Sequence, residues 1–204
     1  MNRNPSRSRL PSAERRATTV QAVIELASVM NPADITTGDI AARMRITQGA
    51  LFRHFATKDE VWREVVDWVT RRVSARLEEA ARKAVSPMEA LEIVFLAQIE
   101  DHARHPGVPR IMFGELQRAE DTPARGMVRT FMERYIKTLQ GFIEQGRAAG
   151  QISPDVEARA AATLFVGLIQ GMVLQSLVSG NLGVVRKKAR DVFALYLRAV
   201  RMTP

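Results

Sequence analysis

Residues 46 to 61, "ITQGALFRHFATKDEV", contain the starts of two predicted helices. Thr47 is placed to cap a short helix that extends to about His54, and Thr57 to Glu60 forms a capping box that opens a long helix. The residues just before it, 37 to 44, predict another short helix that begins at Thr37. Two short helices joined by about three residues have the spacing of a helix-turn-helix.

The second helix of such a motif enters the major groove of DNA with its first side chains at base edges. Gln48 has the amide that bonds adenine, whereas Arg53 and Lys58 suit phosphates. Leu51 and Phe55 are expected to face inward. Each polar residue alone also fits a solvated helix surface, but their combination with two capped helices favours DNA binding. The predicted DNA-contacting residues are Thr37, Arg43, Thr47, Gln48, Gly49, Phe52, Arg53, His54 and Lys58.

Composition agrees with an anionic partner. The 204 residues have a formal net charge of +8 and include no cysteine, so thiol catalysis and disulfide scaffolds are excluded. Residues 1 to 16 are rich in arginine without an apolar run, which predicts a disordered basic arm and no signal peptide. Such an arm is either simply solvated or follows the DNA backbone. We expect a cytoplasmic protein.

The remainder of the chain has helical patterns throughout. Val20, Val23, Ile24 and Ala27 repeat at helical spacing, and Ser-Pro pairs at 86–87 and 153–154 predict further helix starts. No stretch alternates apolar and polar residues for long. The prediction is an all-α protein of about nine helices, with a DNA-binding head at residues 17 to 62 and a larger helical body at residues 63 to 204.

Residues 160 to 185 contain no charged residue and precede Arg186, as in a transmembrane helix. A membrane-anchored helical protein is therefore one alternative. Gln170, Gln175 and Gly180 instead favour a helix buried between the body and a partner subunit, with the amphipathic helix at about 184 to 200 beside it. We expect no membrane association. The expected dimer-interface residues are Leu164, Leu168, Gly171, Met172, Gln175, Val192, Phe193 and Tyr196.

The segment "ITTGDIAARMRITQGALFRHFATKDEVWREV" resembles the DNA-binding head of TetR-type (TetR/AcrR) transcriptional regulators. The resemblance extends over about residues 17 to 66 and includes the Ile40-Ala41, Leu51-Phe52 and His54-Phe55 pairs. Three positions depart from the family pattern. Arg45 stands where the turn usually has glycine, Phe52 replaces a tyrosine whose hydroxyl would bond phosphate, and Asn31-Pro32 replaces a glycine after the first helix.

The resemblance implies a homodimer on a palindromic double-stranded operator, acting as a repressor that a small molecule releases. The expected effector is mainly apolar and lies among the middle helices, although the same residues also fit an ordinary core. An architectural DNA-binding protein without an effector is a second alternative. The expected pocket residues are Trp68, Phe95, Ile99, His102, Met112, Phe113, Met127, Phe131 and Tyr135.

Enzymatic function has no support in the sequence. The chain lacks the G-K-[ST], H-E-x-x-H and G-x-S-x-G motifs, and no cofactor is expected. His102 and His105, near Asp101 and Glu115, are a conceivable metal site, but a His-Pro helix end separates the histidines. We therefore expect no metal.

Overall fold

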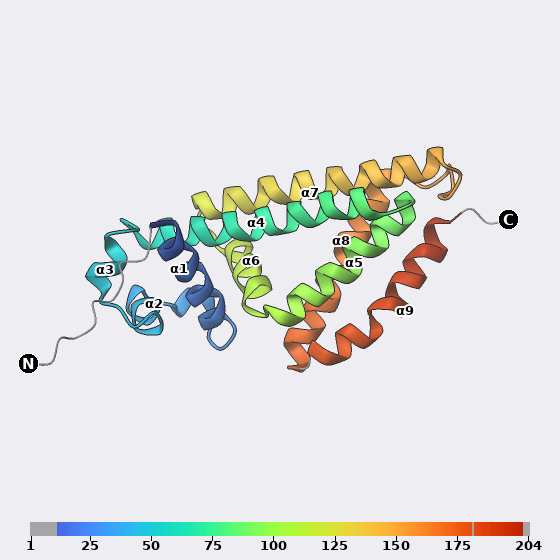
Figure 1. Cartoon of the computed structure of the whole chain (residues 1–204). Helices are drawn as coiled ribbons and strands as arrows, with labels where there is room; N and C mark the ends of the chain where they lie inside the picture. Colours follow the sequence, from blue (N-terminus) through green and yellow to red (C-terminus); the bar gives the residue numbers. More distant parts are fainter. Residues whose placement is uncertain (1–11, 181, 202–204) are drawn as a thin grey trace, which may run out of the picture.

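The computed structural model describes residues 12–180 and 182–201 of the chain, and within them it confirms the all-α prediction (Figure 1). Outside the helices, the only extended contact among these residues is an isolated bridge between Ile152 and Arg201. The helices are α1 (Ser12–Ala27), a 3-10 turn η1 (Pro32–Asp34), α2 (Thr37–Arg43), α3 (Gln48–Phe52), α4 (Lys58–Lys83), α5 (Pro87–Arg104), α6 (Gly107–Gln117), α7 (Pro123–Ala148), α8 (Ala158–Ser179) and α9 (Leu182–Val200).

Side-chain caps define most of the helix starts, as the sequence predicts. Thr47 accepts the Ala50 N–H at 3.1 Å at the start of α3, and Thr57 accepts the Glu60 N–H at 3.2 Å at the start of α4. The cap of α2 is Thr36 and not Thr37, because Thr36 forms a reciprocal capping box with Asp39.

The helix start predicted at Ser153 is wrong. The Ser153 N–H is bonded to the Val200 carbonyl at 2.9 Å, and its hydroxyl accepts the Asp155 N–H in a local turn. Helix α8 begins only at Ala158, where the Glu157 carboxylate accepts backbone N–H groups. A serine before proline therefore stabilises a turn here, which is the competing use of this residue type.

Helices α1 to α3 form the head, in which α1 packs against α4 and α2, and α2 packs against α3; Figure 1 shows the head at one end of the molecule. Helix α4 then continues into the body beside α7 without a break. Its 26 residues span about 39 Å, so the expected boundary near residue 62 lies inside one rigid helix. The expected arm is also corrected, since residues 12 to 16 belong to α1; residues 1 to 11 lie outside the described part of the chain.

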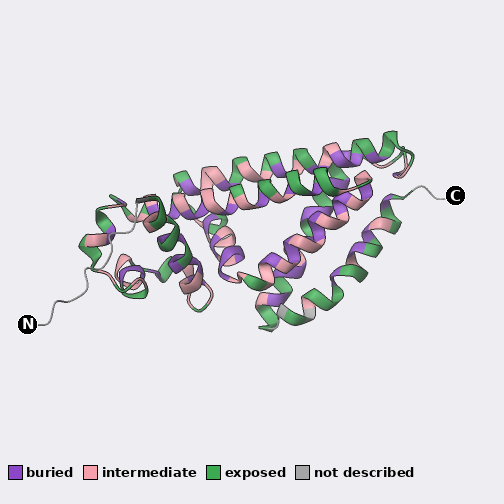
Figure 2. Cartoon of the chain, viewed as in Figure 1, coloured by how far each residue is buried: buried purple, intermediate pink, exposed green. Residues whose placement is uncertain are grey.

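The body is a helical bundle in which α8 packs against α7, α5 and α9 (Figures 1 and 2). Phe95, Phe165, Phe193 and Tyr196 form an aromatic cluster with ring centroids 5.2 to 6.5 Å apart. Helix α8 is the one described helix that is long and apolar enough to cross a membrane, by length and composition. The inner face of α8 nevertheless packs against other helices of the chain, where Ala162 and Phe165 are fully buried.

Candidate DNA-binding head and effector cavity

Helix α3 divides cleanly into a buried face and an exposed face. Leu51 and the following Phe55 are each 1% exposed and fix the helix on the head core, which confirms their predicted orientation. Gln48, Gly49 and Arg53 are exposed, and Phe52 retains 45% of its surface. The exposed face therefore has an amide, a small residue and a guanidinium available to a groove of DNA.

The turn between α2 and α3 contains a strained residue. Arg45 has φ +54°, and it is the only non-glycine residue with positive φ in the described chain. The backbone closes around it through Arg45 N–H to Ala42 and Ile46 N–H to Ala41, each at 3.0 Å. An L-residue in this region costs about 1–2 kcal/mol, so the turn does need the conformation for which glycine is suited.

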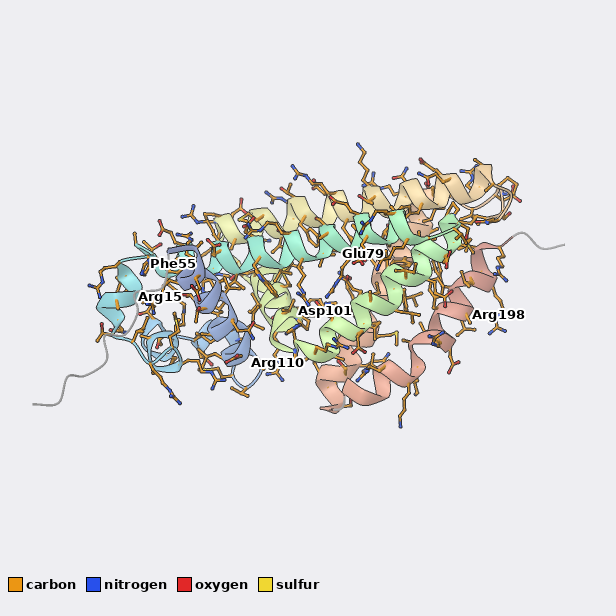
Figure 3. All side chains as sticks on the ribbon, viewed as in Figure 1. Arg15, Phe55, Glu79, Asp101, Arg110 and Arg198 are labelled. Atoms are coloured by element: carbon orange, nitrogen blue, oxygen red, sulfur yellow. The ribbon has the colours of Figure 1, made fainter. Side chains whose placement is uncertain are left out.

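Arg16 stabilises the packing of the head, a role that was not predicted from the sequence. Its guanidinium donates to the Glu64 carboxylate at 2.8 Å and to the His54 carbonyl at 3.2 Å, and it lies 4.6 Å from the Phe55 ring centroid. Figure 3 shows Phe55 in the head, beside α1. Arg16 therefore links α1, the end of α3 and α4, and it is a structural residue and not part of a free arm.

Two predicted DNA contacts have partners within the chain. Arg43 donates to Glu25 at 2.7 Å and holds the pKa of that carboxyl below its usual range, although the arginine side chain remains 54% exposed. Lys58 lies 5.9 Å from the Trp62 ring centroid. The Arg43–Glu25 pair is exposed, and exposed ion pairs contribute little to stability, so this contact does not prevent Arg43 from binding a phosphate.

Gln48 is held at the start of α3 by the neighbouring helix. Its Nε2 donates to the Thr37 hydroxyl at 3.4 Å, so two predicted DNA contacts come together. A Cβ on Gly38 would lie 3.1 Å from the same amide nitrogen. Gly38 therefore leaves room for Gln48, and the sequence alone gave no signal for this role.

The body contains a cavity of about 80 Å³ between α4, α5, α6, α7 and α8. Most of its lining is aliphatic, aromatic or thioether surface, which suits an apolar ligand. The lining residues are Val69, Val73, Gln98, Asp101, His102, Val108, Pro109, Met112, Phe113, Phe131, Met132, Tyr135, Val166, Ile169, Gln170 and Val173.

The titratable groups that line this cavity are Asp101, His102 and Tyr135. The Asp101 carboxylate, which Figure 3 shows in the body interior, accepts from Arg72 at 2.9 Å and from Arg76 at 2.5 Å. These hydrogen bonds outweigh desolvation and lower the Asp101 pKa to about 2, whereas burial lowers the His102 pKa to about 4. Burial also raises the pKa of the Tyr135 hydroxyl. At neutral pH, Asp101 is ionised and both His102 and Tyr135 are uncharged.

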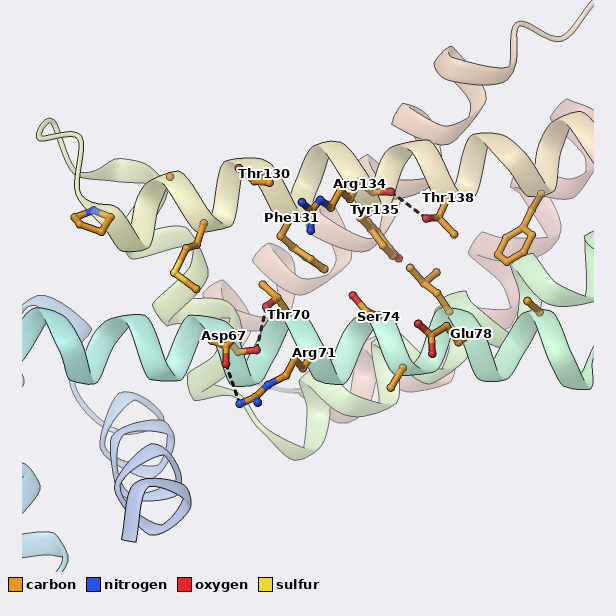
Figure 4. Close-up of a pocket in the computed structure, with 17 residues that line it drawn as sticks. Asp67, Thr70, Arg71, Ser74, Glu78, Thr130, Phe131, Arg134, Tyr135 and Thr138 are labelled. Atoms are coloured by element: carbon orange, nitrogen blue, oxygen red, sulfur yellow. Dashed lines mark hydrogen bonds and ion pairs between the residues drawn. The ribbon is translucent and has the colours of Figure 1, made fainter. Parts of the chain in front are cut away.

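A larger, open groove of about 990 Å³ runs between α4 and α7 (Figure 4). Its rim includes Asp67, Arg71 and Arg134, and Asp67 pairs with Arg71 at 2.9 Å. Phe131 and Tyr135 line both the groove and the smaller cavity, and their rings stack at 5.8 Å. We assign ligand binding to the smaller cavity because it is the less open of the two, and a less open site removes more of a ligand's surface from water.

The predicted pocket residues are only partly brought together. Five of them line the smaller cavity, namely His102, Met112, Phe113, Phe131 and Tyr135, whereas Met127 lies in the groove. The other three residues lie elsewhere. Phe95 belongs to the aromatic cluster, and Ile99 lines a depression beside α9. Trp68 packs edge-on against His105, with the ring centroids 6.4 Å apart. Helical spacing alone could not distinguish these faces of α4 and α5.

No group of three or more potential metal ligands is found in the described part of the chain. Asp101 is engaged by arginines, with His105 Nε2 3.8 Å from the same oxygen. Glu115 accepts from Thr122 at 3.1 Å and is close to Arg118. The two carboxylates of the conceivable metal site are therefore engaged by other side chains.

Helix α6 connects the cavity to the head. Val108, Pro109, Met112 and Phe113 on this helix line the cavity, while Gly107 at its first turn lies against α1. A Cβ on Gly107 would lie 2.0 Å from the Ile24 carbonyl oxygen. Only glycine allows this approach, so α6 and α1 are in direct backbone contact.

The expected interface residues separate into two groups. Met172, Phe193 and Tyr196 are 7%, 2% and 2% exposed and are buried within the chain, which corrects their assignment to a partner surface. The α9 face that carries Phe193 and Tyr196 packs on α5 and α8 instead. Leu164 and Gln175 are exposed, and Leu168, Gly171 and Val192 are half-buried. Leu174 and Val178, which are 56% and 82% exposed, extend the apolar outer surface of α8.

The head is a capped helix-turn-helix with an exposed recognition face, and α4 continues from it into a body that contains an apolar cavity. This combination defines a ligand-binding, DNA-binding regulator. Two family models match the chain: the bacterial regulatory proteins of the tetR family over residues 22–65, and the tetracyclin repressor-like C-terminal domain over residues 115–199. The chain belongs to the TetR family of DNA-binding transcriptional regulators.

Individual relatives are distant. The nucleoid occlusion factor SlmA of Marinobacter nauticus is 23% identical over 91% of this chain and 95% of its own length. The ketosteroid transcriptional regulator KstR2 of Mycobacterium tuberculosis has a TM-score of 0.78 at 20% identity, covering 93% of this chain and 96% of its own. FadR from Bacillus subtilis, solved with stearoyl-CoA, has a TM-score of 0.79 at 16% identity, covering 91% and 99%. These structures share the fold.

Proposed function

We propose that this protein is a cytoplasmic, homodimeric repressor that reads an inverted-repeat operator and is released from it by a small, mainly apolar molecule. The observation that carries the proposal is the position of α6, which lines the cavity with one face and abuts α1 through Gly107. A ligand that needs more than about 80 Å³ must displace a cavity wall. If α6 is that wall, its displacement is transmitted to α1 and reorients α3.

Release then follows from a shift between two states. A ligand favours the state in which the cavity is expanded, and DNA favours the state in which both recognition helices of the dimer fit successive major grooves. Each partner therefore weakens the binding of the other by the same factor. FadR was solved with stearoyl-CoA, which supports ligand binding by a body of this fold.

The dimer is proposed to form through the outer face of α8 together with α9. Leu164, Leu174 and Val178 leave a large apolar area in contact with solvent in the single chain. An isologous contact through this face would give the two-fold symmetry that a palindromic operator requires. Gln175 on the same face is available to bond its counterpart.

The DNA-reading part of the proposal is tested with two variants on the duplex that the wild-type protein prefers. Gln48→Ala should lose about 1–3 kcal/mol on the preferred duplex but little on duplexes changed at the base it reads. Lys58→Ala should weaken binding on every duplex and make the salt dependence shallower by about one counterion per head. A uniform loss for both variants would contradict the assignment of Gln48 to base reading.

A DNA-bound protein that acts without an effector is the second candidate. The observation that favours it is the similarity to nucleoid occlusion factors along most of the chain. This alternative predicts that no cavity ligand changes DNA affinity. A measured change in DNA affinity on filling the cavity would exclude it.

A further inference from the structure

We propose that the cavity takes a small, uncharged molecule with an apolar body and a hydroxyl group, such as an aromatic alcohol. This assignment rests on the proposed effector-binding function of the body. It specifies the chemistry of the effector beyond its apolar character.

Buried polar atoms without hydrogen-bond partners are concentrated at this cavity. Four such side-chain atoms occur in the described residues, and two of them, His102 Nδ1 and the Tyr135 hydroxyl, belong to residues that line this cavity. A third, Arg76 Nη1, belongs to the residue that holds Asp101. A buried polar group without a hydrogen bond is costly and uncommon. The concentration of three such atoms, from helices α4, α5 and α7, at one cavity indicates that a ligand supplies the missing hydrogen bonds.

The charged residues at the cavity disfavour an ionic ligand. Asp101 is the only charged residue among those lining the cavity, so an anionic ligand would face a carboxylate directly. A cationic ligand would instead approach a cluster in which Arg72 and Arg76 outnumber that carboxylate. Both kinds of ion would also lose their hydration in an apolar cavity. An uncharged ligand avoids all three costs.

The donors and acceptors available at the cavity favour a ligand group that both donates and accepts a hydrogen bond. Tyr135 can donate its O–H, and neutral His102 has Nδ1 as either an acceptor or a donor, depending on its tautomer. The Asp101 hydrogen bonds are all made by Oδ1, so Oδ2 remains available as an acceptor. A hydroxyl group both donates and accepts, so it can pair with the Tyr135 hydroxyl or with either form of His102. A carbonyl can only accept, and an alkyl group can do neither.

Size limits the ligand to one ring or a short chain. A cavity of about 150 Å³ is sufficient for benzene, and the present volume is about 80 Å³. Met112 and Met132 line the cavity, and their flexible thioether side chains can yield part of the difference. The rest must come from a wall, and α6 contributes four of the lining residues.

The test is calorimetric titration of the full-length, DNA-free protein at pH 7 with four molecules of nearly equal shape: benzyl alcohol, toluene, benzoate and benzylamine. Benzyl alcohol should bind about tenfold more tightly than each of the others, since it alone satisfies the unpaired groups without a charge. Tyr135→Phe should abolish the preference for benzyl alcohol over toluene. Tyr196→Phe is the matched control and should retain it, because the Tyr196 hydroxyl already donates to the Ala161 carbonyl at 3.2 Å.

Three results would overturn the assignment: equal affinity for toluene and benzyl alcohol, tighter binding of benzoate or benzylamine, or no binding of any of the four. The wild-type comparison decides this even if a variant fails to fold. Operator binding is measured separately on the same preparation. Failure of the ring probes therefore leaves the DNA-reading proposal intact, whereas a protein that binds benzyl alcohol but reads no DNA sequence would contradict the proposed function alone.

Discussion

Removing one oxygen atom from Tyr135 should stabilise the ligand-free protein, whereas the same change at Tyr196 should destabilise it. Tyr135 is 4% exposed, its hydroxyl has no partner, and its ring stacks on Phe131. Tyr135→Phe keeps the ring contacts and removes a buried group whose unmet hydrogen bond costs about 1–3 kcal/mol. Tyr196→Phe removes a hydrogen bond to the Ala161 carbonyl, which is worth about 1 kcal/mol.

The free energies of unfolding of the two variants should therefore differ by roughly 2–4 kcal/mol in favour of Tyr135→Phe. Urea denaturation followed by far-UV circular dichroism measures this difference as a shift in midpoint at constant slope. The protein concentration must be equal in all samples, because dimerisation contributes to apparent stability. If Tyr135→Phe were as destabilising as Tyr196→Phe, the Tyr135 hydroxyl would have a partner in the ligand-free protein, and the reasoning about the cavity would fail.

Three further changes probe the turn, the cavity and the contact between head and body. Arg45→Gly should raise the free energy of unfolding by about 0.5–1 kcal/mol, since relief of a left-handed residue exceeds the added chain entropy of glycine; a loss of stability in the same urea assay would mean that the side chain is needed for folding. Burial lowers the folded-state pKa of His102 to about 4, below the ordinary histidine value of about 6.5, so the unfolded chain binds the proton first and stability should fall as pH is lowered from about 6.5 to 4. His102→Gln should flatten that part of the thermal-stability profile, and an unchanged profile would refute the burial of a neutral histidine. Gly107→Ala should cost several kcal/mol or uncouple α6 from α1, because its Cβ would meet the Ile24 carbonyl, whereas Gly126→Ala, with open space around it, should stabilise α7 by about 0.5–1 kcal/mol. Equal melting temperatures for the two glycine variants would contradict the close approach.

The head could be predicted from the sequence in some detail. Caps and apolar spacing are local signals, and they placed Thr47, Thr57 and the inward-facing Leu51 and Phe55 correctly. The unusual Arg45 could also be identified, because the resemblance to TetR-type regulators implies a glycine at this position of the turn, and Arg45 does have a positive φ.

The cavity could be predicted only in part, because its lining depends on how five helices pack. Phe95 and Phe131 have the same chemistry and both lie on middle helices, yet one joins the aromatic cluster and the other lines the cavity. The same limitation applies to Tyr196, which has an apolar neighbourhood inside the chain and not at a partner surface. Gly107 had no local signal at all, since its role is set by the backbone of a helix about 80 residues earlier.

The central claim is that this protein reads a symmetric DNA sequence as a dimer. Selection of bound duplexes from a random-sequence pool, with the purified full-length chain at near-physiological salt, tests it most directly. An enriched inverted repeat with half-site centres about one helical turn apart is the predicted result. Binding that depends on salt but enriches no sequence would contradict the claim, because it would mean that the net charge of +8 attracts DNA without reading it.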